Sequence, residues 1–341
     1  MKRILVTGGA GFIGSNFVRY LLERRDNCRV IVLDKLTYAG NPDNLLGLED
    51  DPHYLFVKGD ICDAALVRKV ISEEKVDTIV NFAAETHVDR SLMEPGAFIM
   101  TDVFGTYVLL EAAKEHGIEK IIQVSTDEVY GEVKEGSSRE TDPLAPRSPY
   151  SASKAGGDMM ARAYWISHGV PVVITRASNN VGPYQHPEKL VPLFVTNAID
   201  DLPLPVYGDG LQVRDWLYVT DHCAAIDLLL DKGQPGEVYN IGGDNERENL
   251  RVAEAILELL AKPRDLIRHV TDRPGHDRRY SVHSGKIKGL GWQPAHGFEE
   301  AITKTVRWYR DNEWWWRKIK SGEYAEYYQQ NYGHRETIML D

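Results

Sequence analysis

The sequence predicts an α/β protein, in which a doubly wound parallel sheet is joined to a smaller α/β domain in the C-terminal half. Three observations predict it. Short β-branched runs alternate with amphipathic stretches in the first half, a glycine-rich turn follows the first run, and the alternation stops near residue 180. Strands separated by helices form βαβ units, which pack as a parallel sheet with helices on both faces. The length of 341 residues suits about two domains.

Five apolar runs in the first half have the length of buried parallel strands. They are residues 4–6, 30–33, 78–82, 121–124 and 172–175. Between them, Phe17, Val18, Leu21 and Leu22 share one stripe of a predicted helix, and residues 107–113 form another helical pattern.

Prolines divide the chain into short segments after residue 180, so the regular βαβ alternation ends there. Strand-like runs follow at 216–219 and 238–241, and helical patterns follow at 252–260 and 301–309. We therefore expect a first domain at 1–180, to which 213–242 returns. A second, substrate-binding domain would comprise 181–212 and 243–341.

Composition excludes several classes of protein. Forty Lys and Arg against 51 Asp and Glu give a net charge of −11. This charge argues against general binding to nucleic acid or to membrane surfaces, because both are negatively charged. Cys28, Cys62 and Cys223 form no C-x-x-C pair and indicate reduced thiols in a cytoplasmic protein. The first apolar run is too short for a signal peptide, and no run approaches about 18 uncharged apolar residues, so we expect no membrane span.

A glycine-rich turn, TGGAGFIG at 7–14, joins the first predicted strand to the first predicted helix. Gly8, Gly11 and Gly14 permit a tight turn and let the backbone approach a pyrophosphate at the helix N-terminus, as in Rossmann-type domains. Asp34 ends the second strand, about 20 residues further on. Its carboxylate would accept the adenosine ribose hydroxyls and repel a 2′-phosphate, which predicts NAD rather than NADP, although the adjacent Lys35 weakens that preference.

Tyr150 and Lys154 form a Tyr-x-x-x-Lys motif, and Ser148-Pro149 ahead of them resembles a helix N-cap with proline at the first helical position. Positions i and i+4 share a helix face, so the Lys154 ammonium would stabilise a Tyr150 phenolate. Alone, the pattern is equally typical of a solvated helix face. After a dinucleotide fingerprint and a strand ending at Ser125, it indicates a catalytic base.

This combination resembles the extended short-chain dehydrogenase/reductase family, which uses Ser or Thr, Tyr and Lys. The segment VSTDEVYG at 124–131 narrows the match, because its Thr126, Asp127 and Glu128 are similar to the trio of the dTDP-glucose 4,6-dehydratases. The resemblance runs from the first strand to about residue 320. It is carried by segments 34–41, 60–61, 83–91, 179–184, 187–190, 205–208, 214–216 and 272–276 and by Asn249. Thr86 and Val181 depart from it, since Ser and Tyr are usual there.

The resemblance implies three sets of site residues. The catalytic set is Thr126, Asp127, Glu128, Tyr150 and Lys154. The NAD-binding set is Gly8, Gly11, Phe12, Ile13, Gly14, Asp34, Lys35, Leu36, Thr37, Asp60, Ile61, Ala83, Ala84, Glu85, Thr86, Thr101, Tyr150, Lys154 and Asn179. The set that binds the nucleotide sugar is Thr86, His87, Thr126, Asn180, Lys189, Leu190, Pro205, Val206, Tyr207, Arg214, Asn249, Asp272, Arg273 and His276.

The resemblance also implies a reaction on dTDP-glucose. Tyr150 would deprotonate the 4-hydroxyl while NAD takes the C4 hydride, and Thr126 would hydrogen-bond the same oxygen. Glu128 would then remove the C5 proton, and Asp127, held protonated by burial and by the Glu128 charge, would protonate the departing C6 hydroxyl. Return of the hydride to C6 gives a 4-keto-6-deoxy sugar nucleotide. A homodimer built on helices near 103–116 and 150–168 is implied as well.

Other features support narrower interpretations. Lys189, Arg214 and Arg273 are candidates for diphosphate contacts. The consecutive Trp314, Trp315 and Trp316 point about 100° apart on a helix, so we expect packing between domains or subunits rather than base stacking. His87 and His276 have no metal-ligand spacing, and we expect no metal site.

Two alternatives stay open. A UDP-hexose 4-epimerase or a decarboxylase would share the glycine turn and Tyr-x-x-x-Lys but would need no Asp-Glu pair. A non-catalytic NAD-sensing protein would need neither that pair nor an intact Tyr150 and Lys154. The choice between dTDP and UDP does not follow from the residues.

Overall fold

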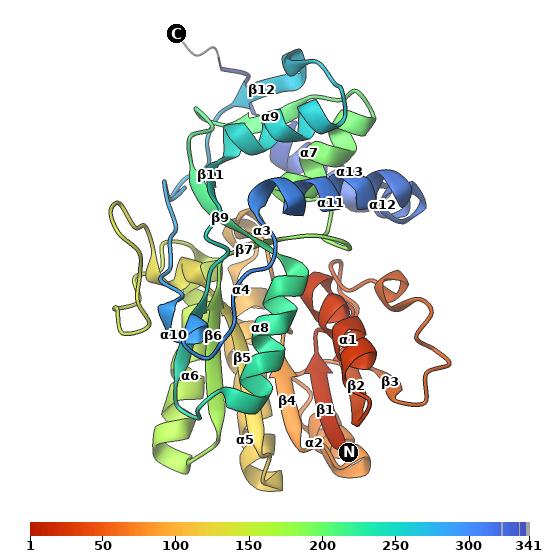
Figure 1. The fold of residues 1–341 in the computed structure, drawn as a ribbon, viewed down its shortest axis with the longest axis vertical. Coiled ribbons are helices and arrows are strands. Elements are labelled where there is room, and N and C mark those ends of the chain that lie inside the picture. Colours follow the sequence, from red (N-terminus) through yellow and green to blue (C-terminus); the bar gives the residue numbers. More distant parts are fainter. Residues whose placement is uncertain (322, 334, 339–341) are drawn as a thin grey trace.

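A seven-stranded, wholly parallel sheet forms the centre of the computed structural model, which describes residues 1–321, 323–333 and 335–338 (Figure 1). In spatial order its strands are β10 (Val238–Ile241), β6 (Val172–Ala177), β5 (Lys120–Thr126), β4 (Thr78–Asn81), β1 (Lys2–Thr7), β2 (Cys28–Asp34) and β3 (Tyr54–Lys58). All five strands predicted in the first half are present, and the predicted fold class is confirmed.

Helices cover both faces of this sheet because its strands are apolar on both sides. Ile4 and Val6 of β1 join one hydrophobic cluster, and Leu5 between them joins the other; all three are fully buried. The first face is covered by α1 (Phe12–Arg24), α8 (Val219–Lys232) and α10 (Gly285–Lys288), and the second by α2 (Ala64–Glu74), α5 (Thr106–His116) and α6 (Pro149–His168).

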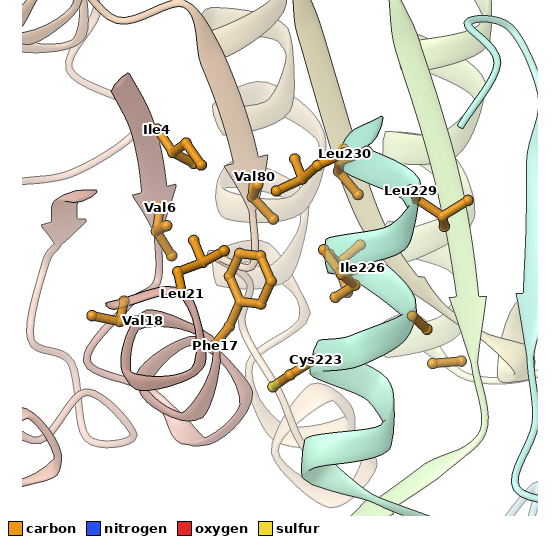
Figure 2. Packing of buried hydrophobic residues seen from close by; sticks show 14 of the residues in the cluster. Ile4, Val6, Phe17, Val18, Leu21, Val80, Cys223, Ile226, Leu229 and Leu230 are labelled. Carbon is orange, nitrogen blue, oxygen red and sulfur yellow. The ribbon is translucent and has the colours of Figure 1, made fainter. Parts of the chain in front are cut away.

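The first of these clusters brings together segments about 200 residues apart (Figure 2). Phe17 of α1 lies between Val80 of the sheet and Ile226 of α8. Leu21 and Leu229 are fully buried in the same cluster. Each such side chain contributes about 1.5–3 kcal/mol through burial, so α8 is held to the N-terminal sheet even though it follows residue 213.

The second half adds two small sheets. One is β11 (Glu246–Glu248), β9 (Val213–Tyr218) and β7 (Asn179–Val181); the other pairs β12 (Ile267–Val270) with β8 (Leu204–Tyr207). Of the segment expected to return to the first domain, α8 and β10 do lie on the large sheet, whereas β9 lies in the three-stranded sheet. The predicted strand at 216–219 ends one residue early, because Val219 begins α8. The domain boundaries themselves stay a prediction.

A third hydrophobic cluster holds the second half together, around α7 (Leu190–Ile199), α9 (Asn249–Leu259), α11 (Phe298–Asp311) and α12 (Glu313–Lys320). Short helices α3 (Val88–Met93) and α4 (Pro95–Phe98) follow β4, and α13 (Glu323–Tyr332) follows α12. In Figure 1 these C-terminal helices lie above the large sheet.

The three consecutive tryptophans behave as their helical spacing predicts. Trp315 and Trp316 are fully buried, whereas Trp314 is 51% exposed. Trp315 Nε1 donates a hydrogen bond to Asn44 Oδ1 at 2.8 Å, which links the C-terminal helices to the loop after β2. Trp315 and Trp316 pack in the third hydrophobic cluster, within the second half of the chain, so the expected packing between domains or subunits stays a prediction.

One continuous helix, 95–116, is long and apolar enough to span a membrane by length and composition alone, among the described residues. Half of its most apolar window is buried inside the protein, and it carries Asp102 and Glu111. These properties are those of a core helix of a folded domain, which passes the same test.

We expect Trp315→Ala to lower the free energy of unfolding by about 3–5 kcal/mol, since it leaves a large cavity and an unpaired Asn44. Trp314→Ala, one residue away on the exposed side, should change it by less than about 0.5 kcal/mol. Denaturant unfolding of both variants measures the difference. Equal losses would contradict the assignment of Trp315 to the link between the halves.

Candidate active site

Two adjoining cavities open at the carboxyl ends of the parallel strands, where ligands bind in open α/β sheets. Both are lined by Thr86, Ser125 and Tyr150. One extends along the glycine turn and the ends of β1, β2 and β4. The other extends into the second half of the chain, between β9, α7 and the segment at 273–276. Tyr150 therefore lies where the two cavities meet.

The first cavity has the shape constraints of a dinucleotide site. Gly8 has a φ of +67°, and a Cβ on Gly14 would lie 2.3 Å from Gly8 O, so the turn excludes side chains there. The N-cap of α1 is Gly11, which has no side chain to cap the helix. Its first-turn N–H groups and the positive end of the helix dipole are therefore available to a pyrophosphate.

Asp34 stands at the far end of this cavity. Its oxygens accept the backbone N–H groups of Ala10 at 2.9 Å and Leu36 at 2.8 Å. Burial raises the pKa of Asp34, and the two N–H donors oppose that rise. Lys35, whose positive charge weakens the predicted preference for NAD over NADP, forms an ion pair with Asp60 at 2.7 Å. Its ammonium group therefore contacts Asp60, a carboxylate that the resemblance also assigned to the cofactor site.

The catalytic helix α6 begins as the sequence predicts. Ser148 is its N-cap, Pro149 is its first residue, and Ser148 and Ser151 exchange the two hydrogen bonds of a capping box. Tyr150 thus lies in the first turn. Lys154, one turn later and 6% exposed, donates a hydrogen bond from Nζ to Val124 O at 2.8 Å. This bond fixes the ammonium beside the end of β5.

Thr126 ends β5 and caps the 3₁₀ turn Asp127–Tyr130 that follows. Its Oγ1 accepts the Glu128 N–H and donates to Asp127 Oδ1, both at 3.2 Å. Asp127 is 2% exposed, and its Oδ2 has no hydrogen-bond partner among the described residues. Burial, then the Glu128 carboxylate, raises the pKa of Asp127 well above its usual value.

Glu128 and Tyr150 share this environment. Burial raises the pKa of Glu128, while the Arg273, Arg214 and Lys189 cations oppose the rise. Burial, and after it the Glu128 charge, raises the pKa of Tyr150 well above its usual value. The adjacent carboxyls therefore differ: Asp127 keeps its proton more readily, and Glu128, facing three cations, loses its proton more readily.

Three cations line the second cavity, and their partners differ. Arg273 is paired with Asp89 at 2.9 Å, and Lys189 Nζ donates to Thr86 Oγ1 at 3.0 Å. Arg214, 5% exposed, donates only to backbone carbonyls, those of Val213 at 2.8 Å and Asp277 at 3.0 Å being the shortest, within the described part of the chain. Burial lowers the pKa of Arg214. A buried guanidinium without a carboxylate partner is suited to an anionic ligand group.

Most residues that the resemblance assigned to ligand binding line one of the two cavities. Three do not lie as assigned. Leu36 lines neither cavity and packs against the first hydrophobic cluster, Asn179 lines the second cavity rather than the first, and Asp272 lies behind it and accepts from His276 Nδ1 at 2.7 Å. All other members of the two predicted sets line the cavity to which they were assigned. Their roles toward ligands stay predictions.

Val181 proves irrelevant to the cavities. It is fully buried in the third hydrophobic cluster and lines neither cavity. Its departure from the usual Tyr therefore removes no side chain from the site as the structure has it. Thr86 keeps its hydroxyl in place, where it accepts from Lys189.

Several lining residues were not predicted from the sequence. They include Glu188, Leu193, Phe194, Trp216, His222 and Tyr332 in the second cavity, Phe82 and His186 in the first, and Ser125 and Gln185 in both. Glu188 and Trp216 lie in segments 187–190 and 214–216, which carry the family resemblance. Their closeness in sequence to Lys189 and Arg214 is the one sequence feature that could have identified them as lining residues. Tyr332 lies beyond residue 320, where the resemblance was taken to end, and the sequence offers no other signal for it.

Comparisons with known proteins agree with this arrangement. The family model described as GDP-mannose 4,6 dehydratase matches residues 5–305. A dTDP-glucose 4,6-dehydratase of Streptomyces niveus is 52% identical, over 95% of this chain and 97% of that protein.

Solved structures are similar as well. The crystal structure of a Bacillus anthracis dTDP-glucose 4,6-dehydratase in complex with NAD has a TM-score of 0.89 and 52% identity, covering 94% of this chain and all of that one. A UDP-glucose 4-epimerase of Thermus thermophilus, also with NAD, has a TM-score of 0.85 at 34% identity, covering 91% and 99%. The fold alone thus does not distinguish dehydratases from epimerases. The chain belongs to the GDP-mannose 4,6 dehydratase family, and its resemblance to the dTDP-glucose 4,6-dehydratases is confirmed.

Proposed function

We propose that this chain is an NAD-dependent dTDP-glucose 4,6-dehydratase, a lyase that converts dTDP-glucose to dTDP-4-keto-6-deoxyglucose. The observation that carries the proposal is the buried Asp127, whose pKa is raised by burial and by the adjacent Glu128, in the lining of the second cavity. An epimerase removes and returns hydrogen at one carbon and needs no acid for a leaving hydroxyl. The names of the similar proteins support the same assignment.

The cofactor supplies redox chemistry that no side chain here can supply. NAD, held along the glycine turn, would supply the hydride acceptor for C4 of the hexose and the hydride donor for C6 at the end of the cycle. Asp34, Lys154 and the first turn of α1 would hold it, and the negative charge and burial of Asp34 favour NAD over NADP. Because the cofactor is regenerated in each turnover, tight retention carries no penalty.

Tyr150 acts first, by accepting the proton of the 4-hydroxyl as C4 is oxidised. Burial and nearby carboxylates raise the pKa of Tyr150, and the Lys154 ammonium and the positive end of α6 would oppose that rise, since Tyr150 lies in the first turn of that helix. Thr126 Oγ1 would hydrogen-bond the same sugar oxygen.

The carboxyl pair carries out the elimination. The 4-ketone acidifies the C5 proton, which Glu128 removes, and the electron pair forms the C5–C6 double bond as the C6 hydroxyl departs. Asp127 gives that hydroxyl its proton, so water leaves and Asp127 becomes ionised. Glu128, once its proton has exchanged with solvent, returns a proton to C5 when the hydride adds at C6, which leaves a C6 methyl group.

We also propose that Lys189, Arg214 and Arg273 bind the diphosphate of the nucleotide sugar. They supply positive charge locally in a chain whose net charge is −11. That net charge supports a small anionic partner rather than nucleic acid or a membrane surface. The free Cys28, Cys62 and Cys223 support action in the cytoplasm.

We propose, finally, that the chain forms a homodimer through α5, α6 and the π-helical segment Ile99–Gly105 before α5. Met100, Phe104 and Tyr107 form an exposed apolar stripe at i, i+4 and i+7. Met159 and Ile166 continue it on α6, and the neighbouring Tyr107 and Tyr164 rings are 6.4 Å apart. Apolar faces of this kind on folded domains usually mark interfaces.

Cofactor preference should follow Asp34. The unmodified protein should bind NAD far more tightly than NADP, because a buried carboxylate would face the extra phosphate. Asp34→Ala should reduce the ratio of NAD to NADP affinity by about tenfold. The control is Asp60→Ala, which removes the ion-pair partner of Lys35 and should leave that ratio largely unchanged, because Asp34 is still present. Fluorescence titration of the stripped protein with NADH and NADPH measures the ratio. Equal affinities in the unmodified protein would refute the argument.

Glu128→Gln should still oxidise dTDP-glucose but stall at the 4-keto hexose, because the amide cannot accept the C5 proton. Stopped-flow absorbance should show bound NADH accumulating, and NMR in heavy water should show no deuterium at C5. Asp127→Asn should keep C5 exchange and slow loss of the C6 hydroxyl. Tyr150→Phe is the reference, since it should lose NADH formation itself by roughly 10²–10⁴-fold. Normal dehydration and C5 exchange in Glu128→Gln would remove Glu128 from the mechanism.

The apolar stripe should control assembly. Ile166→Asp, at a position 68% exposed, should convert the dimer to monomers in sedimentation velocity runs. Leu259→Asp on α9, 42% exposed and outside the stripe, is the matched control and should not. A dimer that survives Ile166→Asp but not Leu259→Asp would place the interface elsewhere.

A further inference from the structure

Asp102 is a buried carboxyl group that the mechanism above does not use. It lies in the π-helical segment Ile99–Gly105 and is 2% exposed. Both of its oxygens have a donor: Oδ1 accepts the Glu85 backbone N–H at 3.0 Å, and Oδ2 accepts from Ser153 Oγ at 2.6 Å. π-Helical turns within helices are frequent at functional sites.

A glycine pair in α6 lets the π-helical segment come this close. A Cβ on Gly157 would lie 2.7 Å from Asp102 O, and one on Gly156 would lie 2.8 Å from Val103 Cγ2. Glycine inside a helix is destabilising relative to alanine. Close contact with the segment that carries Asp102 is a physical reason for two of them in succession.

The two hydrogen bonds join the start of α6 to a loop of the first cavity. Ser153 lies between Tyr150 and Lys154, and its Oγ is also 2.8 Å from Tyr150 O. Glu85 lies in the loop after β4, next to Thr86, and both line the first cavity. Asp102 therefore connects the catalytic turn of α6 to the loop that would lie along the cofactor.

Asp102 also acts on the site through its charge. Burial raises the pKa of Asp102 to about 6, against the attraction of Lys154 and the Ser153 hydrogen bond. The charged groups that face Asp102 are Lys154 on α6 and Glu85 on the loop; those that face Tyr150 are Glu128, Asp127 and Asp102. After burial and Glu128, the charge of ionised Asp102 contributes most to raising the pKa of Tyr150.

We propose that Asp102 is a positioning residue that holds the Tyr150–Lys154 turn against the Glu85 loop and whose charge controls when Tyr150 can act as the base. The inference rests on the proposed role of Tyr150. Above about pH 6 Asp102 is ionised and opposes loss of the Tyr150 proton; below it, the neutral carboxyl donates to Ser153 Oγ and the opposition disappears.

Asp102→Asn tests the charge, because the amide keeps the shape and can exchange hydrogen bonds with Ser153 and Glu85. The rate of NADH formation in a single turnover of the NAD-loaded enzyme with dTDP-glucose is measured against pH. The acid limb of the profile should move to lower pH by about one unit, and the two profiles should converge below about pH 6. Glu115→Gln, which removes an exposed carboxylate from α5, is the control and should leave the limb unchanged.

Ser153→Ala gives an independent test should Asp102→Asn fail to fold. Loss of the donor raises the pKa of Asp102, so the limb should move in the same direction by a smaller amount, with substrate affinity retained. A purely structural role would lower thermal stability and rate without moving the limb. An unmoved limb in the folded variants overturns the inference. Normal NADH formation by Tyr150→Phe would instead overturn the proposed function, whatever Asp102→Asn does.

Discussion

Asp127 is only 2% exposed and is followed directly by Glu128. Two negative charges at these neighbouring buried positions would cost the protein much of its stability. Burial and the Glu128 charge raise the pKa of Asp127 well above its usual value, whereas three cations oppose the rise at Glu128. The proposed catalytic arrangement depends on that difference. It would let one carboxyl group donate a proton while its neighbour accepts one.

That difference requires both halves of the chain. Thr126, Asp127 and Tyr150 come from the ends of β5 and the start of α6, on the large sheet. Arg214 comes from β9, while Lys189 and Arg273 come from the segments around the small sheets. A change in how the halves pack would therefore alter the proton affinities of the carboxyl pair together with the proposed diphosphate contacts of the same three cations. The Trp315–Asn44 hydrogen bond lies at that packing surface.

The sequence predicted those features that depend on local pattern. Apolar runs give the buried strands, the glycine turn gives the dinucleotide cavity, and Ser148-Pro149 gives the start of α6. It did not predict β3, whose residues at the sheet edge are only half-buried or exposed and lack the fully apolar run of a central strand. Nor could it place Leu36, whose positive φ of 58° turns its side chain from the cavity to the core.

Residues whose roles arise from long-range packing were the hardest to predict. His222 reaches the second cavity from α8, which belongs to the first sheet, and Tyr332 reaches it from α13. Neither lies near a motif, and no periodicity separates a residue that lines a cavity from one that fills a core. Asp102 is similar, since its importance follows from a π-helical turn and a glycine pair 54 residues further on.

The outer strand of the large sheet has a consequence for how such a protein can be divided. Because β10 pairs with β6, a fragment that stops before residue 238 would leave the backbone N–H and C=O groups of β6 open along one edge. Exposed strand edges pair with other chains and aggregate. The first 180 residues are therefore not expected to form a stable, soluble domain without β10. A gene fusion or recombination event that transfers it intact must carry β10 along with the first 180 residues, which ties the inheritance of one ligand site to that of the other.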